Sequence, residues 1–341
     1  MSSINKRNGT KPKLTDYEIA NLRGRAGRLL KDLIGRTFVL DEGAFDKDNN
    51  QTELFQEVEK ELHSGYGAKY LEHKESIDTC LIENVPPSKN NKEYSFLLTY
   101  IRQVILKHKW NAQTRLQSVG IELDDKQFEI VSSALDSLSV PAKICYTNRY
   151  WDPLDLNKLY LERNKYKIPK AIANNQIENV LNDVIIKMKN KYPLYSKRYF
   201  DVDEKLIKST CISAKQWVKE TSLKDILANS YIDTPDKIEH RIKLLHNDLS
   251  FGLPMLLKPL YDMQVPESMF LTFIETGAYN PVSRRMIELN IPRETAIFLS
   301  KKYFNNVNAH EVDLEKFIIT KLYEIRNELD YWRRIQIEPL L

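Results

Sequence analysis

The sequence is poor in cysteine and contains no pair of cysteines at metal-binding spacing. Its three cysteines, Cys80, Cys145 and Cys211, lie far apart, and none belongs to a Cys-x-x-Cys pattern. This excludes a disulfide-stapled scaffold and a zinc ribbon, and it indicates a reducing compartment. The chain also lacks an apolar run approaching the roughly 18 residues of a membrane span. Residues 1–13 have no apolar core of a secretory signal, so we predict a cytoplasmic protein without a membrane partner.

Several sequence motifs that mark enzymes are missing as well. There is no Gly-x-x-x-x-Gly-Lys-Ser/Thr phosphate loop, and Asp41-Glu42 is followed by Gly43-Ala44 instead of completing an Asp-Glu-x-His or Asp-Glu-x-Asp magnesium motif. No Gly-x-Ser-x-Gly segment is present, and the six histidines fall singly. We therefore expect no metal ligands and no complete nucleotide-hydrolysis site among these residues.

Helix-favouring residues dominate what is present. The 341 residues are 42% hydrophobic and 29% charged and include ten glycines. Few glycines together with abundant Leu, Ile, Lys and Glu favour helix, and this length allows two or three domains with a sizeable core. We predict a mainly α fold, a helical bundle with a small α/β remnant at the N-terminus.

Proline and asparagine runs, together with shifts in composition, divide the chain into five expected segments. The strongest candidate boundary in the first half is the Pro-Pro-Ser-Lys-Asn-Asn run at residues 86–91. The expected segments are a flexible basic tail at 1–13, an α/β unit at 14–42, an acidic helical connector at 43–92, a winged-helix-like or helical domain at 93–167, and a helical domain at 168–341.

Apolar residues recur at helical spacing through most of the chain. A clear example is the stripe formed by Ile177, Leu181, Val184 and Met188. A strand is expected at 142–146, as part of the winged-helix-like unit. The expected helices cover 51–63, 94–110, 125–138, 203–219, 222–229, 236–248, 252–262 and, as one long element, 311–335.

An arginine- and glycine-rich turn occupies residues 21–28, with the sequence Asn-Leu-Arg-Gly-Arg-Ala-Gly-Arg. Residues 1–40 carry nine Lys or Arg and three Asp or Glu, although the whole chain has a net charge of only +4. A guanidinium presents a planar fork that matches phosphate oxygens, and glycine lets the backbone approach a ligand closely. We predict that this turn contacts a nucleoside triphosphate.

The same turn resembles motif VI of superfamily 2 helicases, in the Ski2-like and DEAD/DEAH-box branches, where it is written Gln-x-x-Gly-Arg-Ala-Gly-Arg. Bacterial helicases of the phage-defence type are similar here. The resemblance implies that Arg28 is the arginine finger, which stabilises charge on the phosphoryl group transferred from ATP, and that Arg25 faces the nucleotide beside it. It also implies that Gly24 and Gly27 shape the turn, and Asn21 stands where the family has glutamine.

The resemblance covers about residues 14–42, which correspond to part of the second RecA-like domain of that family. It implies that ATP and Mg²⁺ are bound mainly by a RecA-like core whose motifs this chain lacks, supplied in cis or in trans. We therefore expect the C-terminal portion of a helicase, inactive as an ATPase by itself. A helical, ratchet-like domain follows the RecA domains in Ski2-like helicases, and the second half of this chain is similar in kind.

A second candidate site lies at residues 283–302, where two helical runs are joined by a tight turn at Asn290. The layout resembles a helix-hairpin-helix, in which backbone N–H groups at the start of the second helix hold nucleic-acid phosphates. Arg284, Arg285 and Arg293 add positive charge. The alternative is an ordinary αα-hairpin.

Aromatic and cationic residues alternate between residues 146 and 166, around Trp151. Such a segment can stack on and clamp a single strand of DNA or RNA. The alternative is that Trp151 and the neighbouring tyrosines are core anchors. The run Trp332-Arg333-Arg334 near the C-terminus is another candidate for phosphate contact, or else a solvated face.

Two functional hypotheses follow. In the first, the chain supplies the arginine finger and the nucleic-acid-contacting helical domain of an ATP-dependent helicase that acts on single-stranded DNA or RNA. In the second, it is a non-enzymatic helical module that binds nucleic acid or protein and retains a vestigial motif VI.

Overall fold

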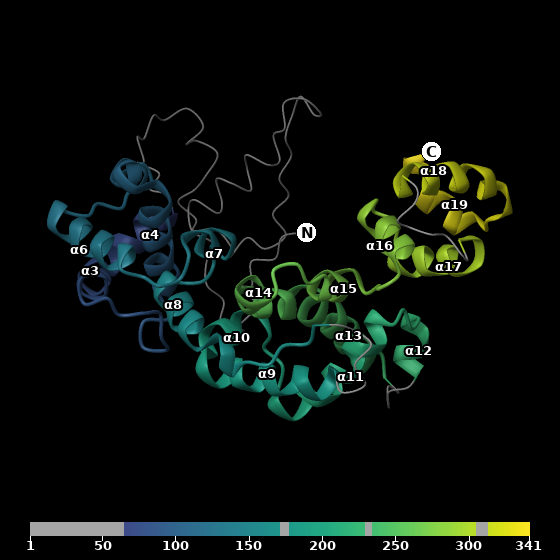
Figure 1. Ribbon diagram of the computed structural model, residues 1–341, viewed down its shortest axis with the longest axis horizontal. Helices are drawn as coiled ribbons and strands as arrows, with labels where there is room; N and C mark the ends of the chain where they lie inside the picture. Colours follow the sequence, from purple (N-terminus) through teal and green to yellow (C-terminus); the bar gives the residue numbers. More distant parts are fainter. Residues whose placement is uncertain (1–64, 171–176, 229–233, 305–312) are drawn as a thin grey trace, which may run out of the picture. The chain divides into compact units, whose positions relative to one another are not determined.

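The computed structural model describes residues 65–170, 177–228, 234–304 and 313–341 (Figure 1). Within these ranges every regular element is a helix and no residue lies in a strand. The described residues form two compact units. Unit 1 contains residues 65–85 and 93–136, and unit 2 contains residues 86–92 and those from 137 onward.

Unit 1 is built around one long central helix, α4 (Ser95–His108), in which residues 97, 98, 101 and 105 are almost fully buried. The buried side chains extend around the helix because neighbouring helices cover several of its faces. Arg102 is also buried, and its guanidinium donates hydrogen bonds to the carbonyls of Cys80 (3.1 Å) and Val85 (2.9 Å) at the end of α3. The other elements are α2 (Gly65–Glu72), α3 (Lys74–Ile82), η3 (Lys109–Asn111), α5 (Ala112–Gln117) and α6 (Asp125–Asp136).

Unit 2 begins with a larger helical assembly, in which α9 (Ile177–Lys191) and α11 (Glu204–Val218) pack side by side. The predicted apolar stripe of α9 is confirmed, since Ile177, Leu181, Val184, Ile185 and Met188 are all buried. The remaining elements of this assembly are α7 (Ala142–Thr147), α8 (Pro153–Glu162), η4 (Arg163–Lys165), α10 (Pro193–Tyr199), α12 (Leu223–Ala228), α13 (Pro235–Lys243), the π-helical η5 (Leu244–Gly252), α14 (Leu253–Gln264) and α15 (Phe270–Thr276).

The last helices of unit 2 share a hydrophobic core of their own, which draws its buried residues from positions 282 to 337. We call this part the C-terminal body. Its centre includes Met286, Leu299, Ile318 and Leu322, each essentially inaccessible to solvent. The elements are α16 (Pro281–Glu288), α17 (Arg293–Tyr303), α18 (Leu314–Ile325), η6 (Arg326–Glu328), α19 (Tyr331–Ile337) and η7 (Glu338–Leu340).

The mainly helical prediction is confirmed for the described residues. The predicted tail at 1–13, the α/β remnant at 14–42 and the helix at 51–63 lie outside the described residues. Two element predictions are wrong.

The strand expected at 142–146 is instead helix α7, which starts directly after Pro141. Proline is well suited to the start of a helix because its φ is fixed and it has no N–H to satisfy. Cys145 lies on the buried face of this short helix. Since residues 93–167 contain no strand, they lack the wing of a winged helix.

The long helix expected at 311–335 is broken. Leu329 is extended (φ −85°, ψ 147°) and buried, so the chain turns to place this side chain in the core. The Asp330 carboxylate then accepts a hydrogen bond from the backbone N–H of Arg333 at 3.0 Å, which caps the new helix α19.

Candidate nucleic-acid interface

The α16–α17 hairpin forms at the predicted position. The tight turn is confirmed, and Asn290 adopts a left-handed conformation with φ of 67°, which asparagine tolerates. The turn closes through hydrogen bonds from Asn290 N–H to the Ile287 carbonyl (2.9 Å) and from Ile291 N–H to the Met286 carbonyl (3.0 Å). Pro292 precedes the first helical residue of α17 and lies at its N-cap position.

Arg293, expected to contact phosphate, is instead buried in contacts with its own chain. Its side chain is only 8% exposed, and the guanidinium lies 3.8 Å from the centre of the Trp217 ring. It donates hydrogen bonds to the carbonyls of Gly277 (2.9 Å), Trp217 (2.8 Å) and Thr221 (3.0 Å), and it also pairs with Glu294. We call this arrangement the Arg293 clamp.

Arg284 and Arg285 both lie on α16, but neighbouring groups engage them. Arg285 pairs with Glu288 at 2.8 Å and with Glu315 of α18, and these carboxylates raise the pKa of its guanidinium. Arg284 is mostly covered, lies over the Phe273 ring at 5.2 Å and is 3.9 Å from Glu288. The three predicted arginines therefore do not converge on one open phosphate site, and the hairpin has the character of an ordinary αα-hairpin.

Trp151 is a core residue with 1% of its surface exposed. Its ring stacks on Tyr195, with centroids 3.9 Å apart and planes 5° apart, and meets the edge of Tyr192. A base cannot stack on a ring that is already covered, so the structure corresponds to the core interpretation of this residue.

Aromatic and cationic side chains of α17 and α19 meet at Phe298, and two exposed aromatic rings lie next to them along α19. Arg333 lies 3.8 Å from the centre of the Phe298 ring, and Lys302 lies 5.6 Å from the same ring. Beside Arg333 along α19, Trp332 and Tyr331 are 72% and 60% exposed, with their rings 5.5 Å apart. We define the α17–α19 surface as these five residues together with the exposed Arg334.

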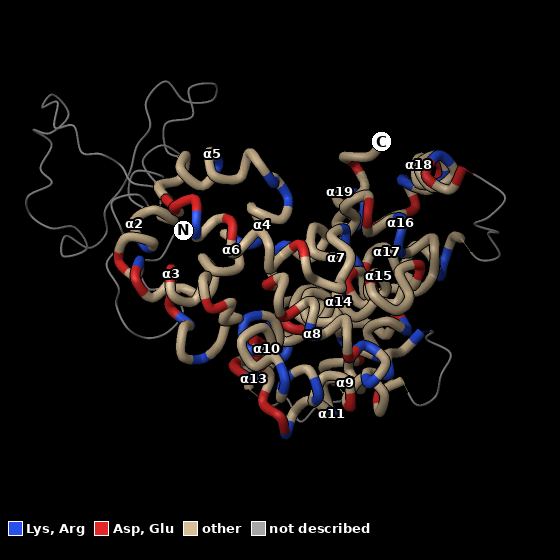
Figure 2. Tube along the Cα trace, turned by 60° about the vertical axis from the view of Figure 1, so that its left-hand side comes forward, with Lys and Arg blue, Asp and Glu red and all other residues tan. Residues whose placement is uncertain are grey.

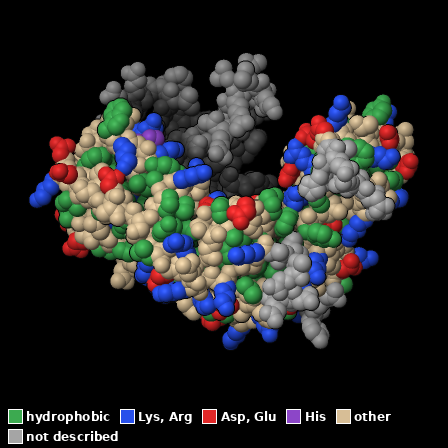
Figure 3. Space-filling view, viewed as in Figure 1, with side chains coloured by type: hydrophobic (Ala, Val, Ile, Leu, Met, Phe, Trp, Pro, Cys, Tyr) green, Lys and Arg blue, Asp and Glu red, His purple; other side chains and the backbone are tan. Residues whose placement is uncertain are grey.

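The sequence contained part of the signal for this surface. The run Trp332-Arg333-Arg334 was visible, but its pairing with Phe298 and Lys302 requires the fold that brings α19 onto α17. Figure 3 shows green apolar, blue cationic and red acidic side chains intermixed on the C-terminal body, at the right of the view. Lys and Arg also alternate with Asp and Glu along the helices of both units (Figure 2), so the surface stands out by its aromatic content more than by its charge.

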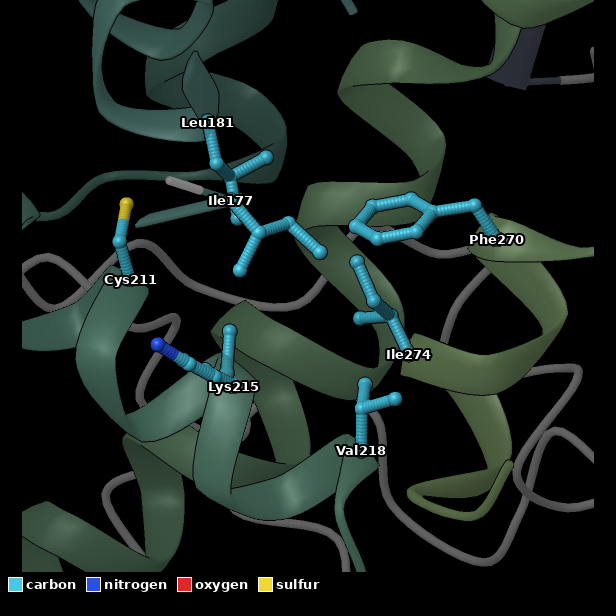
Figure 4. A pocket seen from close by; sticks show the side chains of 8 residues that line it. Ile177, Leu181, Cys211, Lys215, Val218, Phe270 and Ile274 are labelled. Carbon is cyan, nitrogen blue, oxygen red and sulfur yellow. The ribbon is translucent and has the colours of Figure 1, made fainter. Parts of the chain in front are cut away.

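A hollow among α9, α11 and α15 does not offer a reactive site. Its lining is apolar, with Ile177, Leu181 and Phe270 facing one another, while the Lys215 amine points away to Glu178 at 3.0 Å (Figure 4). Burial raises the pKa of the Cys211 thiol to about 12, so the thiol stays protonated and unreactive near neutral pH. Nowhere in the described ranges do three His, Cys, Asp or Glu side chains gather as a metal site would need.

The nucleotide-contacting residues implied by motif VI, Asn21, Gly24, Arg25, Gly27 and Arg28, lie outside the described residues. Among the helices that are described, none is both long enough and apolar enough to cross a membrane. No protein family, curated protein or solved structure matches this chain.

Proposed function

We propose that this chain binds single-stranded nucleic acid through the α17–α19 surface, as the non-hydrolysing C-terminal portion of an ATP-dependent helicase. Two observations of different kind support this. Residues 21–28 resemble motif VI, the arginine-finger motif of superfamily 2 helicases. The α17–α19 surface, which carries the proposal, combines exposed aromatic rings with cationic side chains, of which Arg333 also pairs with Asp330 through one of its guanidinium nitrogens.

The chemistry of a single strand fits these side chains. Every base has a π-face that stacks on an aromatic ring, and each phosphate carries a negative charge that Lys or Arg neutralises. Trp332 and Tyr331 provide the exposed rings, while Lys302 and Arg333 hold their charges over Phe298. A cation placed over an aromatic face is held in position, and it still has donors to offer to a phosphate.

The proposal is tested by fluorescence anisotropy with labelled oligo-dT and oligo-U over a series of salt concentrations. Trp332→Ala should weaken binding about tenfold, because stacking of one base contributes roughly 1–3 kcal/mol. Trp110→Ala is the matched control, since Trp110 is 87% exposed but belongs to unit 1. Equal loss in the two variants, or none in Trp332→Ala, would contradict the assignment of the surface.

The charge contribution is tested separately. Removal of two cations by Arg333→Gln and Arg334→Gln should flatten the slope of log affinity against log salt by roughly 0.7 per lost phosphate contact. The control removes two exposed lysines elsewhere, by Lys126→Gln and Lys143→Gln. If both double variants behave alike, binding depends on overall charge and not on this surface.

A further inference from the structure

The C-terminal body has its own hydrophobic core, and one segment joins it covalently to the rest of unit 2. The core residues all come from positions 282 to 337. Within the described residues, the chain enters the body after α15, through residues 277–280. Non-covalent contacts must therefore set the orientation of the body against α11 and α15.

The Arg293 clamp is the centre of those contacts. Its three carbonyl acceptors lie at or just beyond the ends of two helices: Trp217 is in the last turn of α11, Thr221 follows that helix, and Gly277 follows α15. The last carbonyls of a helix lack partners within the helix and carry a partial negative charge. One guanidinium from α17 thus binds a carbonyl in the last turn of α11 and two carbonyls of the segments that follow α11 and α15, and the Trp217 ring covers its face.

Further polar contacts surround the clamp. The Glu220 carboxylate accepts a hydrogen bond from the backbone N–H of Asn280 (3.0 Å), and the Glu220 carbonyl accepts one from Lys301 of α17 (3.1 Å). Glu220 is 4% exposed and has a positive φ of 59°, which is uncommon for a residue other than glycine. Glu294 of α17 accepts from the backbone N–H of Leu223 at the start of α12 (3.1 Å).

Gly277 occupies a position where a larger residue would not fit. Its φ is 66°, and a Cβ at this position would lie 2.4 Å from the Trp217 ring and 2.5 Å from Arg293 Nε. The close approach of Trp217 and Arg293 thus requires glycine here. The same residue begins the connecting segment, and glycine is the residue whose backbone rotates most freely.

We propose that the Arg293 clamp is a latch that holds the C-terminal body in one orientation against α11 and α15, and that residues 277–280 are the hinge about which the body turns when the latch opens. The C-terminal body and the preceding helices of unit 2 keep their folds in the open state, because each of these two parts buries its own core. α17 carries the latch at its first residue and Phe298 and Lys302 further along, so the latch determines where the α17–α19 surface faces. The proposal holds whether or not that surface binds nucleic acid.

The experiment measures the distance between two spin labels in the full chain without nucleic acid. The labels are attached at Lys187→Cys on α9 and Lys321→Cys on α18, both partly exposed in local ion pairs. A Cys80→Ser background removes the half-buried thiol, and burial raises the pKa values of the other two native thiols, Cys145 and Cys211, to about 12, so they do not react near neutral pH.

The parent protein should give one narrow distance distribution. Arg293→Gln should broaden it about twofold or add a second population, with the helical circular-dichroism signal unchanged. Gly277→Ala, which forces Trp217 and Arg293 apart by a steric route, should give the same change. Arg285→Gln is the matched control, because this arginine is paired with Glu288 and Glu315 inside the body.

An unchanged distribution in both Arg293→Gln and Gly277→Ala would overturn the latch. Loss of helical signal in both variants would overturn it as well, because it would show that the two bodies do not fold independently of the clamp. Arg293→Lys keeps the charge and the stem over Trp217 but cannot reach three carbonyls at once, so it should give a distribution between those of the parent and Arg293→Gln.

Discussion

The ring of Trp151 lies 3.9 Å from the ring of Tyr195, and the two planes are within 5° of parallel. The Tyr195 hydroxyl donates to the Asp155 carboxylate (2.8 Å) and accepts from the backbone N–H of Asp152 (3.0 Å), so the hydroxyl is held both as a donor and as an acceptor. All these groups are buried. This pair joins the start of α8 to α10 and contributes to folding rather than to ligand contact.

Truncation of Trp151 to alanine should therefore destabilise the protein without selectively weakening nucleic-acid binding. Loss of a buried tryptophan costs roughly 3–5 kcal/mol of the free energy of unfolding, because it removes apolar burial and leaves a cavity. Urea denaturation followed by circular dichroism measures the loss. The comparison variant Trp332→Ala, at an exposed site, should stay within about 0.5 kcal/mol of the parent. A larger loss of stability in Trp332→Ala than in Trp151→Ala would contradict the assignment of Trp151 to the core.

A second prediction about stability follows from the positive φ of Asn290. At φ of 67° glycine fits without strain, whereas a β-branched side chain crowds the backbone. Asn290→Gly should change the free energy of unfolding by less than about 0.5 kcal/mol, and Asn290→Val should lower it by roughly 1–2 kcal/mol. Thermal unfolding provides the measurement. The matched control is Asn190→Val in α9, where the exposed asparagine does not have a positive φ; equal losses at both positions would disprove the strain argument.

The sequence predicted most of the helices because their apolar stripes follow the 3.6-residue period. α11 and α14 lie close to their expected bounds, the apolar stripe of α9 is buried, and the tight turn at Asn290 forms at the expected position. These features depend on local spacing and on backbone chemistry, both of which a single sequence contains.

The predictions that failed depended on tertiary contacts. Nothing local distinguishes an arginine that faces solvent from Arg293, which finds Trp217 and three carbonyls 16 to 76 positions away along the chain. The break before α19 arises because Leu329 enters a core that α16–α18 complete. The burial of Trp151 likewise depends on Tyr195, which lies on another helix.

The free energy of unfolding should decrease at alkaline pH because two thiols are buried in the folded protein. Burial raises the pKa values of Cys145 and Cys211 from 9.0 to about 12 in the folded protein. Above pH 9 the unfolded chain therefore binds fewer protons than the folded one, so stability is complete below pH 9 and declines as the pH rises towards 12. Urea unfolding at pH 8 and pH 10 should show this decline.

Two measurements separate the thiols from other groups. Cys145→Ser and Cys211→Ser together should reduce the decline between pH 8 and pH 10, since buried tyrosines such as Tyr261 contribute only above their ordinary value of 10.0. A thiol reagent at pH 8 should leave Cys145 and Cys211 unmodified until urea is added. Rapid modification of either thiol in the folded protein would contradict its burial.

The role proposed for Arg28 predicts a division between ATP binding and ATP hydrolysis. The purified chain should release no phosphate from ATP, with or without nucleic acid, because it contains no phosphate loop and no Asp-Glu magnesium motif. In an enzyme reconstituted with a core that carries those motifs, Arg28→Ala should lower hydrolysis by about 10³- to 10⁵-fold, since an arginine finger acts on the charge of the transition state. ATP binding, measured with a fluorescent nucleotide, should stay nearly unchanged. Arg36→Ala is the matched control, because it removes an arginine of the same stretch outside residues 21–28. Robust turnover by the chain alone would refute its assignment as a helicase portion, and normal hydrolysis in the reconstituted Arg28→Ala enzyme would remove this residue from the finger role.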